Sequence, residues 1–415
     1  MSPPAPCVKL PRMPAPKPLS VYIHFPYCAV KCPFCNLNAW ERSTFDETAY
    51  ADCIAREAEA VAQAAGGDYK VTTIFIGGGT PSLMSGNAVR RILKYASKHW
   101  ETADETEISL EAHPLSCGRE KLESLRTAGI NRISIGAQSF LPEKLKILGR
   151  DHGAGRCFEA VAAAQAAGFE NISVDIIAAA PEETPERFER DIRLAADTGA
   201  NHFSVYGLEV ERGTRFYSLR KSGGITLPSD DEAAEMASLA AGVLQSRGFE
   251  RYEISSFSTP QTRCLHNINY WLSGDYIGLG AGAHSHMTTA DAPFGVRWAN
   301  PRNPEQYMEA ARHRRRARTE ILDPETGFSD NVMMGLRLAG GMNLALAEKR
   351  FGVRTDAAAL ERLRRGGLIE REGETVRITE KGLLVANPVI AEVARAGRAI
   401  GYNPQFQEET RNGKN

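Results

Sequence analysis

Three cysteines lie within eight residues of one another, in the segment Cys28-Ala-Val-Lys-Cys32-Pro-Phe-Cys35. Three thiolates on one short loop can ligate three irons of a cubane iron–sulfur cluster and leave the fourth iron without a protein ligand. An open coordination position is what a metal needs to engage a substrate. A zinc site with a fourth ligand from elsewhere, such as Cys264 or His266, is the alternative, although the spacing alone favours the cluster.

A run of three glycines is the second sequence motif that could take part in binding or catalysis. The apolar segment 71–76 is typical of a strand and leads directly into Gly77-Gly-Gly-Thr80-Pro-Ser82. Three glycines at a strand end permit unusual backbone angles and the close approach of a small ligand. Their exposed backbone groups could bind an α-amino group or a carboxylate. Glycines also serve simple turns, so the motif is informative mainly in combination with the cysteine loop.

The elements that must position these loops follow from the alternation of apolar and helical segments. Near-continuous apolar strands separated by Ala-rich amphipathic stretches predict a parallel sheet that is buried on both faces. The expected helices are Glu47–Ala65, Asn87–His99, Gly155–Ala167 and Pro185–Thr198. The expected strands are Leu19–Phe25, Val71–Ile76, Glu107–Glu111, Arg132–Ala137, Asn171–Ile177 and His202–Leu208.

Six such units are too few to close an eight-stranded barrel. We therefore expect an α/β fold built on an open, partial (βα)6 TIM-like barrel. Chemistry in such folds collects at the carboxyl ends of the strands. Cys28 follows the first strand, the glycine run follows the second, and Glu111 and Gln138 end the third and fourth.

The pattern changes after about residue 229. Residues 230–247 are typical of a helix, Tyr252–Phe257 of a short strand, and the Gly-rich residues 274–283 of a turn or a close-approach site. Two helical stretches and a hairpin at 368–379, with Gly373 near its tip, predict a small α+β, winged-helix-like domain. Three acidic residues on that hairpin argue against DNA binding, namely Glu370, Glu372 and Glu374.

These shifts divide the chain into five expected regions. They are a flexible Pro-rich leader (1–17), the partial barrel (18–228), a barrel extension with a substrate- or haem-facing segment (229–327), the winged-helix-like domain (328–400) and a flexible tail (401–415).

The composition excludes several classes of partner. Lys and Arg number 50 against 51 Asp and Glu, so the net charge of −1 gives no general attraction to nucleic acid or to anionic membranes. No apolar run approaches the ~18 residues that a membrane span requires. Without the apolar core of a signal peptide, the protein is expected to be cytoplasmic. In a reducing compartment, a cysteine cluster is more typical of metal binding than of disulfides.

The cysteine loop and its surroundings resemble the radical S-adenosylmethionine (SAM) superfamily. The similarity is to the branch that contains oxygen-independent coproporphyrinogen III oxidase and the haem chaperone related to it. It extends from about residue 19 to 395, nearly the whole chain. Besides the cysteine loop, the segments that carry it are Tyr22-Ile-His24-Phe-Pro26, Ile76–Ser82, Arg132–Phe140, Leu148–Arg150, Tyr252–Ser255 and Asp275–Gly280.

This resemblance implies a [4Fe–4S] cluster on Cys28, Cys32 and Cys35, with S-adenosylmethionine on the open iron. An electron from a donor of the flavodoxin or ferredoxin type would reach the sulfonium, and the broken carbon–sulfur bond would give a 5′-deoxyadenosyl radical. The implied cofactor contacts are Tyr22 on the cluster side, Gly78, Gly79 and Thr80 at the methionyl end, Glu111 at the ribose, Gln138 and Arg150 at the ribose and carboxylate, and Asp175 completing the pocket.

Two features bear on which member of the branch the chain resembles. The oxidase has a further cysteine two residues after its third ligand, where this chain has Leu37, so coproporphyrinogen decarboxylation is not expected. The segment 264–271 instead resembles a motif of the haem chaperones. In that interpretation His266 ligates haem iron while Tyr270 and Trp271 pack against the flat macrocycle. An aromatic structural corner is the alternative.

Other departures from the chaperones leave a second function open. Asn36 and Leu37 replace an acidic and an aromatic residue, His113 replaces an asparagine, and Ile177–Pro181 replaces a Gly-Leu-Pro turn. Changes near the reaction cavity suggest a specialised substrate. The alternative is therefore a class C-type radical SAM methyltransferase, or a cyclopropane-forming enzyme, that uses two SAM molecules on an aromatic or heteroaromatic substrate. A third interpretation makes the C-terminal domain a docking surface for a haem-accepting or peptide partner.

Overall fold

Six parallel strands form the centre of the molecule. The computed structural model describes residues 16–42, 44–65, 68–313 and 318–400, so most of the expected leader and the expected tail lie outside the described residues. The strands are β1 (Lys17–Phe25), β4 (Tyr69–Gly78), β5 (Glu101–Ala112), β6 (Arg132–Gln138), β7 (Asn171–Ala178) and β8 (His202–Gly207), hydrogen-bonded in that order. All six lie where the apolar runs predicted them.

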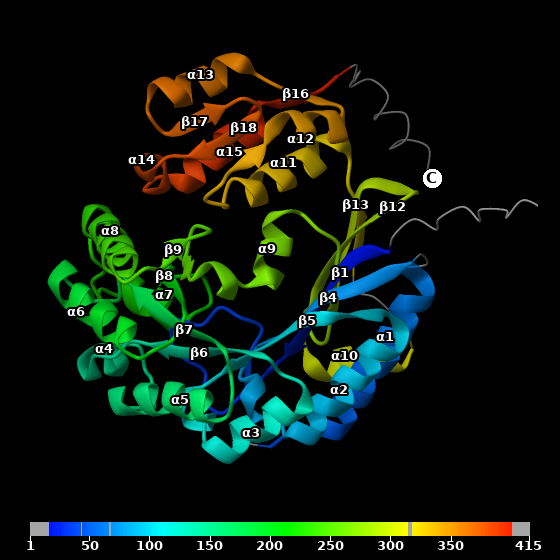
Figure 1. Cartoon of the computed structure of the whole chain (residues 1–415), viewed down its shortest axis with the longest axis vertical. Coiled ribbons are helices and arrows are strands. Elements are labelled where there is room, and N and C mark those ends of the chain that lie inside the picture. Colours follow the sequence, from blue (N-terminus) through cyan, green and yellow to red (C-terminus); the bar gives the residue numbers. More distant parts are fainter. Residues whose placement is uncertain (1–15, 43, 66–67, 314–317, 401–415) are drawn as a thin grey trace, which may run out of the picture.

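Helices between these strands cover one face of the sheet (Figure 1). They are α1 (Glu47–Ala65), α2 (Gly86–His99), α3 (Arg119–Ala128), α4 (Pro142–Ile147), α5 (Ala154–Ala166) and α6 (Pro185–Ala196), followed by α7 (Arg215–Lys221) and α8 (Asp230–Ser246). The apolar faces of α1, α2, α3, α5, α6 and α8 join the central strands in one continuous hydrophobic core. Phe216 of α7 packs instead in a small separate cluster with Leu148, Ile177 and Ala180. Within the described residues, no helix has the length and apolar character needed to cross a membrane.

The sheet continues beyond the six parallel strands at both edges, and of these added strands the sequence pattern predicted only part of one, within Tyr252–Phe257. At the β1 edge, β11 (Tyr276–Leu279) pairs parallel with β1, and β12 (His284–Thr289), β13 (Ala292–Ala299) and β14 (Arg318–Ile321) follow antiparallel. At the β8 edge lie the short antiparallel strands β10 (Ser256–Ser258) and β9 (Glu250–Arg251). The described sheet thus has 12 strands in one open order, which confirms the partial barrel.

Two expected local elements differ from the structure. The predicted strand Tyr252–Phe257 is confirmed only at its end, because Ser256 and Phe257 lie in β10 whereas residues 252–255 form the connection between β9 and β10. The Gly-rich segment 274–283 contains β11 as well as the expected turn. Gly280 has a φ of +102° in that turn, and a side chain there would collide with the His24 carbonyl. The glycine therefore serves close packing of the segment against β1.

The C-terminal elements lie together on the opposite side of the sheet from α2, α3 and α5 (Figure 1). They have a hydrophobic core of their own. The expected hairpin is present, with Gly373 at a φ of +59° between its strands. The elements are α11 (Pro324–Gly335), β15 (Met342–Asn343), α12 (Leu344–Phe351), β16 (Val353–Thr355), α13 (Ala357–Arg365), β17 (Ile369–Glu372), β18 (Thr375–Ile378), α14 (Glu380–Leu383), α15 (Ala386–Ala396) and β19 (Gly397–Ala399).

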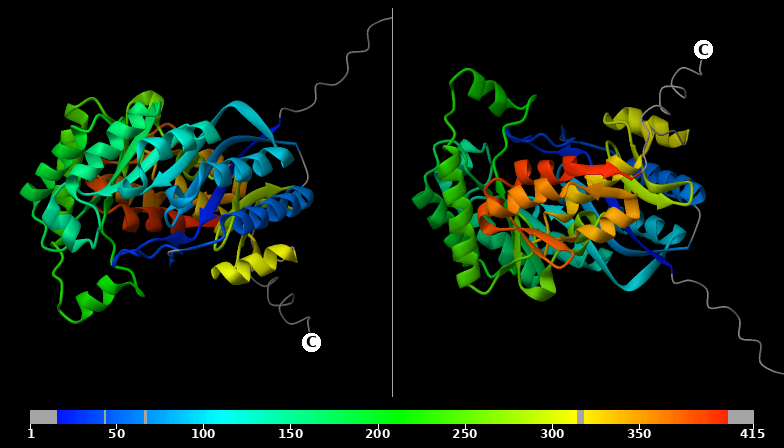
Figure 2. Two further views of the ribbon diagram at one scale, coloured as in Figure 1. Left: turned by 90° about the horizontal axis from the view of Figure 1, so that it is seen from below. Right: turned by 90° about the horizontal axis from the view of Figure 1, so that it is seen from above.

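Short elements connect these parts. Helix α9 (Leu265–Trp271) packs between β4 and α11, and α10 (Pro304–Arg312) lies beside α1 (Figure 2). The cysteine loop lies between β2 (Tyr27–Cys28) and β3 (Trp40–Glu41), which pair parallel to each other. Three short 3₁₀ helices span Pro81–Leu83, Pro114–Ser116 and Pro260–Thr262.

Candidate cofactor and ligand site

The cysteine loop follows the carboxyl end of β1, as expected. Cys28 is buried, whereas Cys32 and Cys35 are half-buried and so remain accessible. The Cys35 N–H donates to the Cys32 carbonyl at 3.1 Å, which turns the loop back on itself. Burial, together with the neighbouring thiols of Cys35 and Cys32, raises the pKa of the Cys28 thiol to about 11. Three thiolates can be held together here only if a bound cation offsets their mutual repulsion.

The glycine run packs against the cysteine loop. The Gly79 N–H donates to the Phe25 carbonyl at 2.7 Å, and the Thr80 N–H donates to the Tyr27 carbonyl at 2.8 Å. A β-carbon at position 79 would lie well inside van der Waals contact of the Tyr27 carbonyl. The sequence analysis expected the backbone groups of the glycine run to be exposed. This is wrong for the N–H groups of Gly79 and Thr80, which bind the start of the cysteine loop.

Two carboxylates on β5 and β7 lie near enough for the charge of Asp175 to act on Glu111. Glu111 accepts the Gly78 N–H at 2.9 Å, and Asp175 accepts the Ser134 hydroxyl at 3.0 Å. Burial raises the pKa of Glu111 to about 7, against the opposing effect of the Gly78 N–H, and Asp175 raises it further. Burial likewise raises the pKa of Asp175. Such carboxylates are strong acceptors for the hydroxyl or ammonium donors of a ligand.

Tyr22 and His24 connect β1 to the far end of the cysteine loop. The His24 Nε2–H donates to the Asn38 carbonyl at 2.9 Å, so His24 Nδ1 accepts the Tyr22 hydroxyl, also at 2.9 Å. The Asn38 amide in turn donates to the Ala281 carbonyl at 2.9 Å. Both nitrogens of His24 are thus occupied, and this histidine has a structural role.

Gln138 and Arg150 lie at the end of β6. Gln138 has a φ of +66°, a left-handed conformation that is uncommon for a residue with a side chain and typical of functional sites. Arg150 donates through Nη1 to Cys32 Sγ at 3.1 Å and through Nη2 to the Gly136 carbonyl at 2.9 Å. Its buried Nε has no partner among the described residues. The guanidinium therefore joins the cysteine loop to β6 and retains one donor for an anionic group.

The position of Cys264 bears on the zinc alternative. Its thiol donates to Glu107 at 3.7 Å instead of facing the cysteine loop. One of the two residues considered as the fourth ligand of a zinc site is therefore engaged elsewhere, whereas a cubane cluster with an open iron needs no fourth protein ligand.

His266 is a buried core residue, contrary to its expected role as a haem ligand. Its Nδ1 lies 2.8 Å from the Thr73 hydroxyl and its Nε2 lies 2.9 Å from the Tyr270 hydroxyl. Its side chain is 1% exposed, and burial, with a smaller contribution from Arg132, lowers its pKa to about 3. Because both nitrogens are occupied, His266 is not available to haem iron in this conformation.

A large cavity of ≈ 730 Å³ opens beside the cysteine loop. Asn36, Leu37 and Asn38 form one side of it, and residues of α9, β12, α11 and α12 form the others. Tyr270 and Trp271 line it as expected, whereas His266 does not. The remaining lining is mainly apolar or cationic and includes Tyr22, His284, His286, Phe294, Arg297, Arg302, Leu322, Met333, Met334, Arg350 and Phe351.

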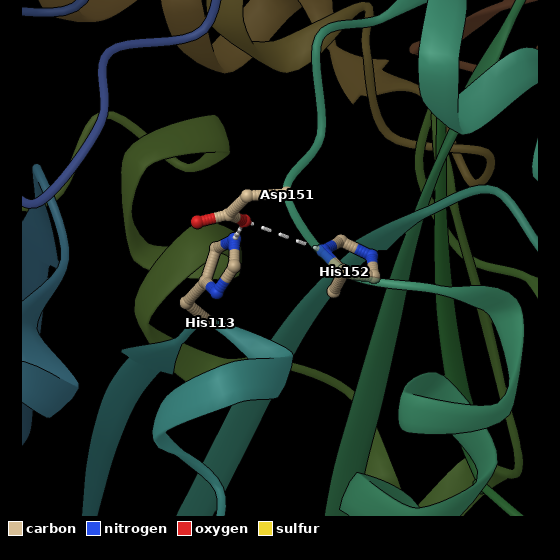
Figure 3. A group of neighbouring side chains, drawn as sticks. All are labelled: His113, Asp151 and His152. Atoms are coloured by element: carbon tan, nitrogen blue, oxygen red, sulfur yellow. Dashed lines mark ion pairs between the residues drawn. The ribbon is translucent and has the colours of Figure 1, made fainter.

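Two groups of residues were not predicted as site residues. His286 lines the cavity, and neither of its ring nitrogens has a hydrogen-bond partner among the described residues. His113, Asp151 and His152 come together next to Arg150 (Figure 3), with His113 Nε2 3.2 Å from Asp151 Oδ1. The only sequence signal for this group was the histidine at position 113, where the relatives have an asparagine. The sequence could not show that His113 lies next to Asp151, because only the fold brings these two positions together.

Comparisons with known proteins agree with this geometry. The model of the radical SAM superfamily matches residues 22–195, and the HemN C-terminal domain matches residues 322–385. The chain is 33% identical to the protein named "Heme chaperone HemW" of Mycobacterium tuberculosis, over 90% of this chain and 94% of that protein. It is also 33% identical to "Heme chaperone HemW" of Escherichia coli, over 92% and 98%.

A solved structure shares the fold over nearly the whole chain. It is that of coproporphyrinogen III oxidase (HemN) from Escherichia coli, with a TM-score of 0.77 and 22% identity over 92% of this chain and 90% of that one. The fold of the C-terminal elements and of the extended sheet is thus shared with that enzyme.

Proposed function

The chain belongs to the HemN- and HemW-containing branch of the radical SAM superfamily, and on that premise we propose that it is a haem-binding protein with a radical SAM centre. The observation that carries the proposal is the cavity of ≈ 730 Å³, which begins at Asn36–Asn38 of the cysteine loop. A ligand in that cavity would lie beside the cluster.

The residues at the strand ends fit the cluster and its cofactor. Cys28, Cys32 and Cys35 would hold a [4Fe–4S] cluster, which supplies the electron that cleaves S-adenosylmethionine when both are bound. Arg150 would stabilise the thiolate of Cys32 and offer its free Nε to the cofactor carboxylate. The other proposed cofactor contacts are Tyr22, Gly78, Gly79, Thr80, Glu111, Gln138 and Asp175.

The cavity has the chemistry that a haem requires. Aromatic and apolar side chains can pack against a flat macrocycle, and arginines can pair with its carboxylates. The Trp271 indole N–H and the Ser273 hydroxyl belong to lining residues, are buried, and have no partner among the described residues. Buried polar groups are rarely left unpaired, so a ligand that accepts from Trp271 would complete the site.

His286 is the proposed iron ligand in place of His266. It lies on β12, stacks on Tyr276 with ring centroids 6.2 Å apart, and lines the cavity. Its Nε2 packs against Gly295, so Nδ1 would be the nitrogen that offers the lone pair. Burial lowers the pKa of this imidazole, which favours its neutral form. A neutral imidazole is the usual proximal ligand of haem iron.

The methyltransferase alternative is not favoured. The two relatives reported above, each 33% identical over at least nine tenths of the chain, are named as haem chaperones. A second molecule of S-adenosylmethionine has no support in these comparisons. The electron donor and the partner that accepts haem belong to the same proposal, and a donor of the flavodoxin or ferredoxin type suits the half-buried cysteines.

Anaerobic reconstitution followed by haem titration tests the proposal. We expect about four irons and four sulfides per chain, 5′-deoxyadenosine on reduction with S-adenosylmethionine, and stoichiometric haem binding with a Soret band. Replacing Trp271 by alanine should weaken haem binding at least tenfold and leave the iron content unchanged. Replacing Tyr95 by alanine, an aromatic residue on the outer helix α2, serves as the matched control.

A failure would be easily recognised. If the wild-type protein binds no haem, or if the Trp271 and Tyr95 variants bind it equally well, the cavity is not a haem site. If iron is bound but no nucleoside is cleaved, the radical SAM part of the proposal fails separately.

A further inference from the structure

Two imidazoles and a carboxylate converge between the ends of β5 and α4 (Figure 3). His113 follows β5 directly, whereas Asp151 and His152 follow α4. His113 Nε2 lies 3.2 Å from Asp151 Oδ1, and His152 Nδ1 lies 4.0 Å from the same oxygen. The ring centroids are 5.1 Å apart and the ring planes lie at 81° to each other.

An ion pair between His113 and Asp151 would not explain the environment of His152. Its side chain is 0% exposed, and its Nε2–H donates to the Ala137 carbonyl at 3.1 Å. The neutral ring therefore has a lone pair on Nδ1, and this buried atom has no partner among the described residues. A lone pair that faces a carboxylate oxygen is repelled by it, so a cation or a donor between the two would stabilise the arrangement.

We propose that His113, Asp151 and His152 form a binding site for one divalent transition-metal ion of the zinc class. Two imidazole nitrogens and one carboxylate oxygen are ligands that zinc prefers. In a tetrahedral site with bonds near 2 Å, ligand atoms lie roughly 3.3 Å apart. The three atoms here already lie within 4.8 Å of one another. Asp151, the most exposed of the three, can close the remaining gap by rotating its side chain.

Binding has one identifiable cost. His113 Nδ1 accepts the Leu115 N–H at 3.3 Å, so Nε2 carries the ring proton in the empty site. Coordination through Nε2 requires the single ring proton to move from Nε2 to Nδ1, which breaks this long hydrogen bond and leaves the ring neutral. The nearest fixed cation, Arg150, is directed to Cys32 and to the Gly136 carbonyl instead of the site.

The position of the site gives the ion a role. Glu111 and His113 are two residues apart at the end of β5, and Arg150 immediately precedes Asp151. An ion held by His113, Asp151 and His152 would join the two loops that carry Glu111 and Arg150. It would therefore fix the positions of two groups that line the proposed cofactor pocket, without itself taking part in the reaction.

Zinc titration of the full-length, cluster-loaded protein tests the site without reference to haem. Zn²⁺ is added alone, its affinity is measured by competition with a chromophoric chelator, and the iron content is followed in parallel. We expect one Zn²⁺ per chain and at least tenfold weaker binding in His113→Asn and in Asp151→Asn. The asparagine introduced by the first change can still accept the Leu115 N–H as a helix cap, so that variant should fold. His313→Asn, at an exposed His–Glu pair, is the matched control.

X-ray absorption at the zinc edge provides a second measurement, in which two imidazole nitrogens should be visible in the wild type. The inference is overturned if no Zn²⁺ binds beyond the cluster iron, or if the His113 and Asp151 variants bind it as tightly as the wild type. A loss of iron on adding Zn²⁺ also overturns it, because the ion would then occupy the cysteine loop. These outcomes do not depend on haem binding.

Discussion

Histidines near the cavity differ in whether their nitrogens are free to act. His24 and His266 have both ring nitrogens in hydrogen bonds to neighbouring groups. His286 has none among the described residues, and it lines the cavity. The ring nitrogens, rather than the surrounding sequence motif, therefore distinguish a candidate ligand from a core residue.

Replacing each histidine by alanine should separate the two roles. His286→Ala should weaken haem binding at least tenfold and alter the Soret band, with little change in melting temperature. His266→Ala leaves the Tyr270 hydroxyl without its partner, removes one of the two partners of the Thr73 hydroxyl and creates a cavity, so it should lower stability by about 2–4 kcal/mol. Haem titration and thermal unfolding measure the two effects. The opposite pattern would make His266 the ligand.

His266 also makes stability depend on pH. Burial, and secondly Arg132, lowers its pKa to about 3, whereas a histidine in the unfolded chain titrates near 6.5. Between these values the unfolded state binds a proton that the folded state does not, so stability is lost as the pH falls from 6.5 towards 3. One such group contributes a slope of about 1.4 kcal/mol per pH unit.

Urea unfolding between pH 6 and pH 4 measures this slope. The His266→Gln variant should be less stable at pH 7. On acidification its free energy of unfolding should fall less steeply, with a slope smaller by about 1.4 kcal/mol per pH unit. His313→Asn, at an exposed position, should keep the wild-type slope. Equal slopes in the wild type and the His266 variant would show that the buried imidazole becomes protonated without unfolding.

At the scale of elements, β4 holds the cysteine loop through its glycines. Replacing Gly79 by alanine would force a methyl group against the Tyr27 carbonyl and displace the start of that loop. The barrel core does not include this position, so we expect a folded protein whose reconstituted iron content falls several-fold. Gly242→Ala, within α8 and with open space around it, should leave the iron content unchanged. Iron analysis and circular dichroism check both variants.

Long apolar runs explain why the sequence predicted the six parallel strands and their helices. Such runs leave little choice of structure when both faces of a sheet are buried. The edge strands are shorter and partly polar. His284 and Arg297, for example, lie in β12 and β13 but face the cavity, so their pattern gives no apolar alternation. Residues 252–255 alternate Tyr and Ile with Glu and Ser like a strand, yet they form a bent connection in which Glu253 bridges to Leu338.

The candidate site also has one part that the sequence could predict and another that it could not. Cys28, the glycine run and Glu111 follow predicted strands, so their convergence could be expected from the order of parallel strands. The cavity could not, because Asn36 and Met333 meet only through the packing of α11 against the barrel. The same is true of His113 and Asp151. Contacts between distant segments depend on the arrangement of whole elements, which local pattern does not encode.

At the scale of the whole molecule, the cavity lies between two hydrophobic cores. One core belongs to the barrel and the other to the C-terminal elements. Several direct contacts join the two parts, among them the Arg337 guanidinium over the Trp271 ring at 5.6 Å and the ion pair between Arg251 and Glu380 at 2.6 Å. A ligand in the cavity would add to these contacts because it would touch residues of both parts.

Hydrogen exchange followed by mass spectrometry should detect that contribution. Haem should slow the exchange of backbone amides in α9, β12 and α11 together, because it would contact residues from each of them. The outer helices α2 and α3 should exchange at the same rate with and without haem, which provides an internal control. In the Trp271→Ala variant the protection should disappear from all three elements at once. Protection confined to the barrel or to the C-terminal elements would mean that haem binds one part alone and does not join the two cores.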